Sequence, residues 1–434
     1  MNPTPKPLHV LLVTPAFPPF PGGGERYAHA LALNLARRGQ RVTVVTSTAQ
    51  AEQDFWRGRP QFQTPAPGEL CVIRCPLRPF PGGRHGLLAW RKAMTLLTLL
   101  PGDQTAVLLR MARLIPPIQG LREALDALPT AVDVVHGFNI SWEHALATGW
   151  EFARRRALPY AATPFTHFGV MGADRVARNS TMDHQRRILR TADRVFALTA
   201  VEKAGLTAFG VDPRRITVCG GGADPLPAAI DQSLPAQKYG LAQPYVLFVG
   251  RAGYEKGAIH AAQAIIALRQ AGHEALLALA GQSTPEFARF YARLPRDLQE
   301  GIRPLGVVSE SDKHALLAGA QMLVLPSRTD SFGIVLLEAW AHGKAVIGAR
   351  AGGIPGVIDA DENGLLVDFG DVAALTAAIR QLLTDPNARK TLGRSGQAKV
   401  ARVYNWSGVT DLVLAGYAAL LDEADRKQRL SFTN

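Results

Sequence analysis

Two carboxylates lie eight positions apart in the segment PSRTDSFGIVLLEAWAHGKAV, residues 326–346. Asp330 stands in a polar turn after an expected strand, and Glu338 stands in the second turn of an expected helix that begins at Gly333. Two acceptors of different reach suit a polyhydroxylated ligand, and N–H groups at a helix start can donate to it. The candidate backbone donors are Phe332, Gly333 and Ile334. The alternative is an N-cap role for Asp330 and a polar helix face for Glu338.

Two cations flank a second expected corner between a strand and a helix, GRAGYEKG, residues 250–257. Arg251 follows the strand and Lys256 precedes the helix. A guanidinium fork and an ammonium point charge at such a corner suit a diphosphate. The alternative is a pair of exposed loop charges.

A third candidate is the glycine triplet of PPFPGGGERYAHAL, residues 18–31, which follows the first expected strand. Backbone without side chains at Gly23 and Gly24 lets a phosphate or a sugar approach closely. The spacing is not that of a G-x-G-x-x-G dinucleotide motif, because Tyr27 stands where its last glycine would fall. His136 and His167 end two further strands and are expected to face a cleft. We expect no metal site, because no His, Cys and Asp residues have ligand spacing.

The composition is that of an ordinary globular protein, with 47% apolar and 19% charged residues in a chain of 434. The three cysteines do not form a disulfide framework, so a reducing compartment is expected. The N-terminal apolar stretch is too short for a signal peptide, and no apolar run has the length of a membrane span. The expected location is cytoplasmic.

The net charge of +12 is unevenly distributed: residues 1–235 carry 27 Lys and Arg against 17 Asp and Glu. A basic first half can meet an acidic acceptor, a nucleic acid or an anionic membrane, and the alternative is a solvated basic face. Residues 86–128 mix leucines with cations. They fit either a helix at the membrane surface or a pair of helices that pack on the core. The second interpretation is favoured.

Strand-like and helix-like segments alternate along the chain, which predicts parallel α/β architecture. The pattern restarts after a proline-rich stretch. We therefore expect two doubly wound, Rossmann-like domains facing a cleft, with ligands at the carboxyl ends of the strands. The expected divisions are a domain over residues 1–224, a linker over 225–244, a second domain over 245–405, and a last helix over 406–434 that packs back on the first domain.

Together the three segments resemble the family 4 glycosyltransferases, which are retaining enzymes of the GT-B fold. Their order and spacing match the family over essentially the whole chain. The family signature is a carboxylate, seven residues and then Glu, which here runs from Asp330 to Glu338. Asp330 is a departure, because most members have Glu there. The segment AGGIPGVI, residues 351–358, is similar to another family segment, but Gly356 stands where Glu is commoner, and no role is assigned to it.

The resemblance implies that Glu338 holds the ribose of a nucleotide sugar and that Asp330 contacts the transferred sugar. It also implies that Arg251 and Lys256 hold the donor diphosphate and that His167 lies beside the reacting sugar. The remaining donor-site positions implied by the resemblance are Gly23, Gly24, Phe332, Gly333 and Ile334. Charge that develops on the leaving phosphate would then be stabilised by cations and helix N–H groups.

The expected activity is therefore transfer of a sugar with retention from a UDP or GDP sugar, without cofactor, metal or nucleic-acid partner. The acceptor is not identified by the sequence, and lipid-linked and polysaccharide acceptors are both considered, with peripheral contact to an anionic membrane at its inner face. One alternative is a non-catalytic protein that binds nucleotide sugars. Another is a nicotinamide-dependent oxidoreductase, which the glycine spacing disfavours.

Overall fold

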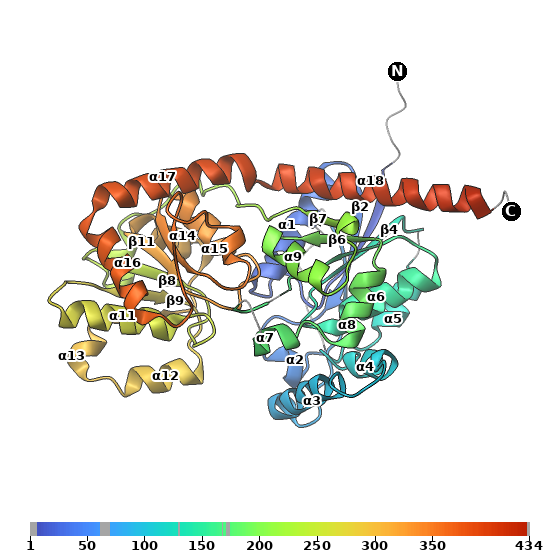
Figure 1. Ribbon diagram of the computed structural model, residues 1–434, viewed down its shortest axis with the longest axis horizontal. Coiled ribbons are helices and arrows are strands. Elements are labelled where there is room, and N and C mark those ends of the chain that lie inside the picture. The colour runs from blue at the N-terminus through green and yellow to red at the C-terminus, as the bar shows by residue number, and fades with distance from the viewer. Residues whose placement is uncertain (1–6, 61–69, 129–130, 167, 171–173, 432–434) are drawn as a thin grey trace, which may run out of the picture. The chain divides into compact units, whose positions relative to one another are not determined.

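The computed structural model describes residues 7–60, 70–128, 131–166, 168–170 and 174–431. The chain forms two compact units (Figure 1). Unit 1 comprises Met1–Thr166, Arg175–Gly220 and Trp406–Asn434, and unit 2 comprises His167–Asp174 and Gly221–Asn405. The expected division at residue 224 therefore differs in detail, because residues 167–174 and 221–224 belong to unit 2.

Unit 1 is built on a parallel sheet of seven strands in the order β3-β2-β1-β4-β5-β6-β7. The interior strand β1 has five consecutive buried residues, as expected for a strand covered on both faces. The strands are β1 His9–Val13, β2 Arg41–Ser47, β3 Cys71–Cys75, β4 Val134–Phe138, β5 Tyr160–Thr163, β6 Arg194–Ala197 and β7 Ile216–Val218.

The helices of unit 1 connect these strands. They are α1 Gly23–Arg37, α2 Asp54–Arg57, α3 Gly83–Leu97, α4 Thr105–Ala112, α5 Leu121–Asp126, α6 Glu143–Arg155, α7 Arg175–Arg178, α8 Asp183–Thr191, α9 Ala200–Ala208, the short 3₁₀ turn Pro213–Arg215, and α18 Trp406–Ser431. Helix α1 ends before Gly39, which adopts a φ of 80° that favours glycine. The long C-terminal helix α18 lies against α1 and β6 (Figure 1).

Three polar contacts hold α18 on unit 1, one in the core and two on the surface. The buried Tyr417 hydroxyl lies 2.6 Å from Nδ1 of His136 in β4. On the surface, Arg38 donates to Ser407 at 2.7 Å and lies 2.8 Å from Asp411. The C-terminal segment therefore completes the core of the first unit although it follows the second unit in the chain.

Unit 2 is built on a parallel sheet of six strands in the order β10-β9-β8-β11-β12-β13. Its strands are β8 Val246–Val249, β9 Leu277–Ala280, β10 Ile302–Gly306, β11 Met322–Leu325, β12 Ala345–Ala349 and β13 Leu365–Val367. Both sheets are doubly wound, so the predicted α/β class with two Rossmann-like units is confirmed.

The helices of unit 2 are α10 Leu234–Tyr239, α11 Ala258–Gln270, α12 Pro285–Ala292, α13 Arg296–Gln299, α14 Glu310–Gly319, α15 Ile334–Ala341, the 3₁₀ turn Ile354–Gly356, α16 Val372–Thr384 and α17 Pro386–Val403. Residues 225–244, which we expected to be a linker, contain α10 and belong to unit 2. Lys238 and Tyr239 of α10 each lie 2.6 Å from Oδ2 of Asp312 in α14. Pro235 lies in the first turn of α10, where a helix tolerates proline, so the prolines of this segment do not prevent a packed helix.

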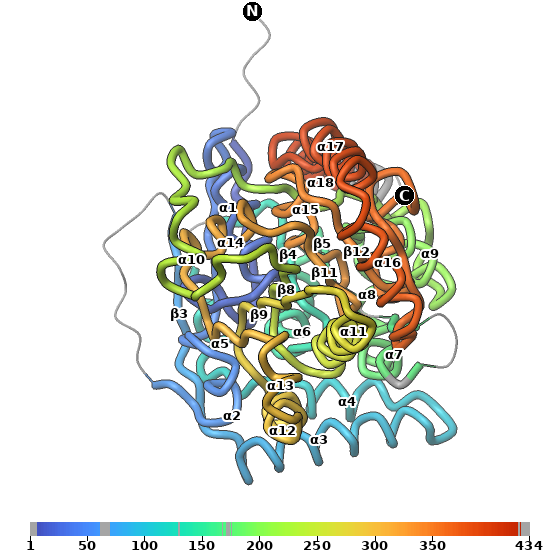
Figure 2. Tube along the Cα trace, turned by 90° about the vertical axis from the view of Figure 1, so that its left-hand side faces the viewer, coloured from blue at the N-terminus to red at the C-terminus, as the bar shows by residue number. Residues whose placement is uncertain are grey.

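Residues 86–128 form most of α3, together with α4 and α5. Helices α3 and α4 run along one edge of unit 1 (Figure 2). Their inner sides enter a core cluster that includes Leu87, Met94 and Leu108, which agrees with the core-packing interpretation for that side. Within the described residues, no helix has both the length and the apolar composition needed to cross a membrane.

Candidate functional site

The strand order of unit 2 reverses direction between β8 and β11, which are hydrogen-bonded neighbours. Open α/β sheets bind ligands outside the carboxyl ends of the two strands at such a switch point. Lys256 follows β8 and Asp330 follows β11. The structure brings them together, with Nζ of Lys256 2.8 Å from Oδ1 of Asp330. The two predicted site residues therefore form a half-buried ion pair where this fold type holds its ligands.

Backbone packing fixes the loop that carries Lys256. Gly257 has a φ of 77°, and a Cβ there would lie 2.1 Å from the carbonyl oxygen of Pro326 at the end of β11. Only glycine allows α11 to begin so close to the neighbouring loop. On the other side of Lys256, the Glu255 carboxylate accepts from Nη2 of Arg328 at 2.8 Å. Arg251, by contrast, is an exposed residue beyond β8.

The loop of Asp330 is held by the glycine pair of the segment 351–358. Gly353 donates its N–H to the carbonyl of Asp330 at 2.7 Å. A Cβ at Gly352 would lie 2.3 Å from the same carbonyl oxygen, and one at Gly353 would lie 1.9 Å from that of Ser331. These glycines therefore have a role that sequence reasoning did not assign, since they let two loops pack backbone against backbone.

Helix α15 begins at Ile334, one residue later than expected, and Gly333 is its N-cap with a φ of 79°. Phe332 is buried and packs at 5.5 Å on the ring of Tyr404 and over Gly221. The Phe332 side chain therefore belongs to the core of unit 2, and any ligand contact from this position comes from the backbone. N–H groups of the first helical turn lack acceptors within the helix, so this end of α15 favours an anion.

Glu338 does not extend into open space. Its side chain is about 6% exposed, and Oε1 lies 2.8 Å from Nζ of Lys313 in α14. Lys313 also contacts Oε2 of Glu310 at 2.7 Å. Nearby, Nδ1 of His314 lies 3.0 Å from Nε2 of His342. Burial, with a contribution from His314, lowers the pKa of His342 to about 4, so this imidazole is neutral at pH 7.

The glycine loop of unit 1 lies at the matching switch point, after β1 and beside β4. A Cβ at Gly24 would lie 3.0 Å from the ring of Phe165, so any larger residue there would have to displace this ring. A Cβ at Gly22 would lie 2.0 Å from Oε2 of Glu25, which places that carboxylate over the loop. Burial raises the pKa of Glu25 to about 7. The structure thus adds a buried carboxyl group to the first turn of α1, which begins with Gly23 and Gly24.

The two histidines expected to face a cleft have different outcomes. His167 lies outside the described residues. His136 is fully buried, and its Nε2 lies 2.8 Å from the Thr163 hydroxyl. Burial lowers the pKa of His136 to about 3. The expectation for His136 is therefore wrong, because this side chain is a neutral part of the core beneath α18.

Sequence reasoning missed Lys313 and Glu25. Lys313 is separated from Glu338 by 25 residues, and nothing in its local pattern distinguishes it from an exposed helix lysine. Glu25 had a visible signal, because it follows the glycine triplet directly and falls in the first turn of α1. An acidic residue in the first turn of a helix usually stabilises the helix N-terminus, so the sequence alone did not indicate a buried carboxyl group.

The sequence matches two family profiles that cover most of its length. Residues 22–222 match the family described as "Glycosyl transferase 4-like domain". Residues 233–399 match "Glycosyl transferases group 1". The D-inositol 3-phosphate glycosyltransferase of Geodermatophilus obscurus is 30% identical over 70% of this chain and 70% of its own. This chain therefore belongs to the group 1, family 4 type of glycosyltransferases.

A second relative is the glycogen synthase of Mycobacterium tuberculosis, which is 30% identical over 54% of this chain. The match spans only 55% of that synthase. Among solved structures, a sucrose-phosphate synthase from Thermosynechococcus elongatus superimposes with a TM-score of 0.71 at 22% identity, covering 96% of this chain and 100% of its own. Anabaena Alr3699/HepE, solved with UDP-glucose, gives 0.68 at 18% identity, covering 95% and 100%. These likenesses confirm the GT-B fold.

Proposed function

We propose that this chain is a glycosyltransferase that moves a sugar from a nucleoside-diphosphate sugar, of the UDP or GDP type, to an acceptor with retention at the anomeric carbon. The observation that carries the proposal is the pair of Lys256 and Asp330 at the switch point of unit 2, 2.8 Å apart. Family membership supports it, as do the names of the relatives. The Anabaena structure with UDP-glucose shows that this fold accommodates such a donor in another protein.

The chemistry that this pair serves is departure of the nucleoside diphosphate. An ammonium has three donors, so Lys256 can keep its bond to Asp330 while donating to a phosphate oxygen. Charge grows on that oxygen as the glycosidic bond breaks, and preorganised donors stabilise it most when it is fully developed. Arg251 and the N–H groups at Gly333 and Ile334 supply further donors. Each such donor contributes on the order of 3 kcal/mol to the transition state.

The remaining assignments in this proposal follow the family resemblance. Asp330 accepts from hydroxyls of the transferred sugar, and Glu338 accepts from the ribose. Gly23 and Gly24 leave room for phosphate or acceptor, and His167 lies beside the reacting sugar. The proposal includes no resident cofactor, metal or nucleic acid, and the donor is a substrate.

The acceptor is proposed to be lipid-linked or a polysaccharide, and the proposed location is the cytoplasm, with peripheral contact at the membrane inner face. An acceptor panel should also include D-inositol 3-phosphate and glucan primers, which are the chemistries that the relatives' names indicate.

The test is release of nucleoside diphosphate from a panel of UDP and GDP sugars with and without acceptors. We expect Lys256→Ala to lower turnover about 100-fold, which corresponds to the loss of one transition-state donor. Glu338→Ala should mainly raise KM for the donor. Lys238→Ala is the matched control, because that lysine also pairs with a carboxylate in unit 2, at 2.6 Å, but lies in α10 and not in the loops that follow β8 and β11. NMR of the product anomer tests retention.

The outcomes separate the alternatives. Turnover that falls less than threefold in Lys256→Ala, with the fold intact by circular dichroism, would contradict the assigned role of the pair. Donor binding without turnover across the acceptor panel would favour a non-catalytic binding protein. Thermal stabilisation by NAD(H) and by no nucleotide sugar would favour an oxidoreductase.

A further inference from the structure

The outer side of α3, α4 and the turn between them carries a concentration of exposed apolar side chains. Five of the twelve large hydrophobic residues that are exposed in the described part of the chain fall within 20 positions here. They are 47–65% exposed and comprise Leu88, Leu96, Leu99, Leu100 and Val107. Single exposed leucines are normal, but several that are concentrated on two successive helices and the turn between them indicate an interaction surface.

These side chains are not needed to hold the two helices in place, because the inner sides are already packed. Leu87 and Met94 of α3 and Leu108 and Ala112 of α4 lie in one buried cluster. The indole N–H of Trp90 also joins the helices by donating to the carbonyl of Met111 at 3.1 Å. The five exposed apolar side chains on the outer side are therefore not part of the core that holds α3 and α4.

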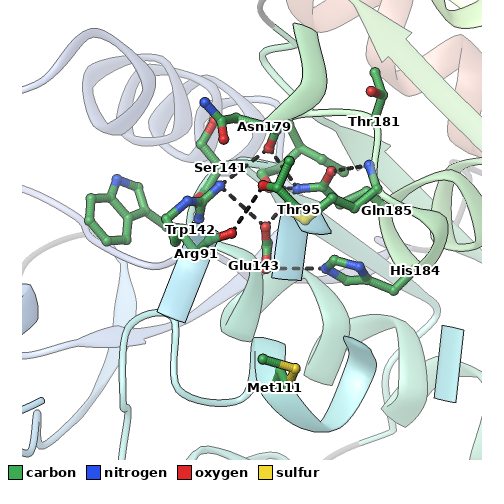
Figure 3. A network of polar contacts seen from close by, with 12 residues as sticks. Arg91, Thr95, Met111, Ser141, Trp142, Glu143, Asn179, Thr181, His184 and Gln185 are labelled. Atoms are coloured by element: carbon green, nitrogen blue, oxygen red, sulfur yellow. Dashed lines mark hydrogen bonds and ion pairs between the residues drawn. The ribbon is translucent and has the colours of Figure 1, made fainter. Parts of the chain in front are cut away.

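A buried polar network also fixes α3 to the rest of unit 1. Figure 3 shows the Arg91 guanidinium reaching toward Ser141, Asn179 and Glu143. It donates to the carbonyls of Ser141 at 2.7 Å and Asn179 at 3.2 Å, and lies 3.4 Å from the Glu143 carboxylate. Glu143 is itself buried and accepts from Gln185 at 2.6 Å. Helix α3 is thus a firmly held platform whose outer side stays exposed.

The exposed apolar residues are interleaved with cations. Arg84, Lys92 and Arg110 are exposed residues of α3 and α4. Leu88, Lys92 and Leu96 follow one another at intervals of four, which places them on one face of a helix. From residue 83 to residue 114 the sequence contains a single acidic residue, Asp103. Leucines bordered by lysine and arginine are typical of helices that lie in the interface of anionic lipids.

We propose that the outer side of α3 and α4 docks on an anionic lipid bilayer, with the leucines at the acyl boundary and the cations at the headgroups. The charge pattern selects this occupant. A second copy of the chain would bring two basic faces together, which is repulsive, whereas a bilayer with negative headgroups complements both the cations and the apolar stripe. No described helix can cross the membrane, so the contact is peripheral. This inference rests on the peripheral membrane contact of the proposed function and assigns it to named residues, and it is independent of the donor chemistry in unit 2.

The test is co-sedimentation of the full chain with vesicles of phosphatidylcholine alone and of phosphatidylcholine mixed with phosphatidylglycerol. We expect binding to the mixed vesicles that weakens with salt. Leu96→Ser with Leu99→Ser should lower binding more than tenfold, because both side chains lose apolar area that the bilayer would bury. Lys92→Gln should lower it about fivefold, as for one cation at a charged surface. The matched control is Val307→Ser in unit 2, where the side chain is 76% exposed but stands outside this surface.

Several results would overturn the proposal. They are absence of binding to the mixed vesicles, an equal loss in Val307→Ser, and binding that survives the leucine substitutions. A fourth is association of the lipid-free protein with itself that the leucine substitutions abolish, since the surface would then face a second copy. Nucleoside diphosphate release without lipid should stay unchanged in these variants. Failure of vesicle binding and failure of the proposed transferase activity can therefore be told apart.

Discussion

Lys313 provides the sharpest test of the geometry in unit 2. Its ammonium lies 2.8 Å from the Glu338 carboxylate, and the two side chains are 7% and 6% exposed. The other contact, to Glu310 at 2.7 Å, involves a carboxylate that is 67% exposed. Lys313 thus pairs with one buried and one exposed carboxylate. Substituting the lysine and the carboxylates separately shows how much each ion pair contributes to the free energy of unfolding.

We expect Lys313→Met to lower the free energy of unfolding by about 3–5 kcal/mol, because it removes the cation from a buried carboxylate. Glu310→Gln should cost less than about 1 kcal/mol, as for an exposed pair. Adding Glu338→Gln to Lys313→Met should restore part of the loss, because a neutral amide is cheaper to bury than a charge. Guanidinium unfolding followed by circular dichroism measures all four proteins.

The same substitutions test whether Lys313 positions Glu338 for the proposed ribose contact. We expect Lys313→Met to raise KM for the donor with a smaller change in kcat, and Lys313→Arg to restore most of the affinity because the charge is kept. If Lys313→Met unfolds within about 1 kcal/mol of Glu310→Gln, the buried pair does not stabilise the unit as its burial implies. If KM is unchanged in a folded Lys313→Met protein, the positioning role is refuted.

Three further predictions concern unit 1. Burial raises the pKa of Glu25 from 4.5 to about 7, so the native state keeps a proton that the unfolded chain releases between these values. Stability should therefore fall as pH rises from about 4.5 to 7, by a few kcal/mol at most, and Glu25→Gln should flatten this slope in urea unfolding; parallel slopes would contradict the burial effect. Tyr417→Phe should cost about 1–3 kcal/mol in thermal unfolding, because it leaves the buried Nδ1 of His136 without its partner at 2.6 Å; an unchanged Tm would show that this hydrogen bond does not stabilise the unit. Gly24→Ala should cost about 1–3 kcal/mol, because its Cβ would lie 3.0 Å from the Phe165 ring, and Phe165→Leu should relieve part of that loss; an unaffected Gly24→Ala protein would show that the ring moves freely.

Much of the fold could be predicted because the signals are local. Buried parallel strands appear as short apolar runs, and His9–Val13 is such a run. A helix ending before Gly39 follows from the ability of glycine to adopt positive φ. For residues 225–244 local signals were misleading. The prolines suggested a linker, whereas α10 is held by Asp312, a residue more than 70 positions away.

The candidate site was predictable in part for the same reason. Lys256 and Asp330 could each be placed at the end of a strand, and parallel strands end at one edge of a sheet. Their contact required the strand order, which places β8 beside β11 and which no local pattern encodes. The burial of His136 likewise depended on Tyr417, 281 residues later. Long-range partners decide whether a polar side chain faces a ligand or completes the core.

The position of Asp330 illustrates how such partners compensate for a shorter side chain. The family usually has Glu at this place, and the sequence left open how far Asp could reach. In the structure the backbone of Asp330 is held by the Gly353 N–H at 2.7 Å, while its carboxylate meets Lys256 at 2.8 Å. Both contacts come from loops whose glycines, Gly257 and Gly352, allow close backbone approach. The reach of this carboxylate is therefore set by how closely the loops approach one another as well as by the length of its own side chain.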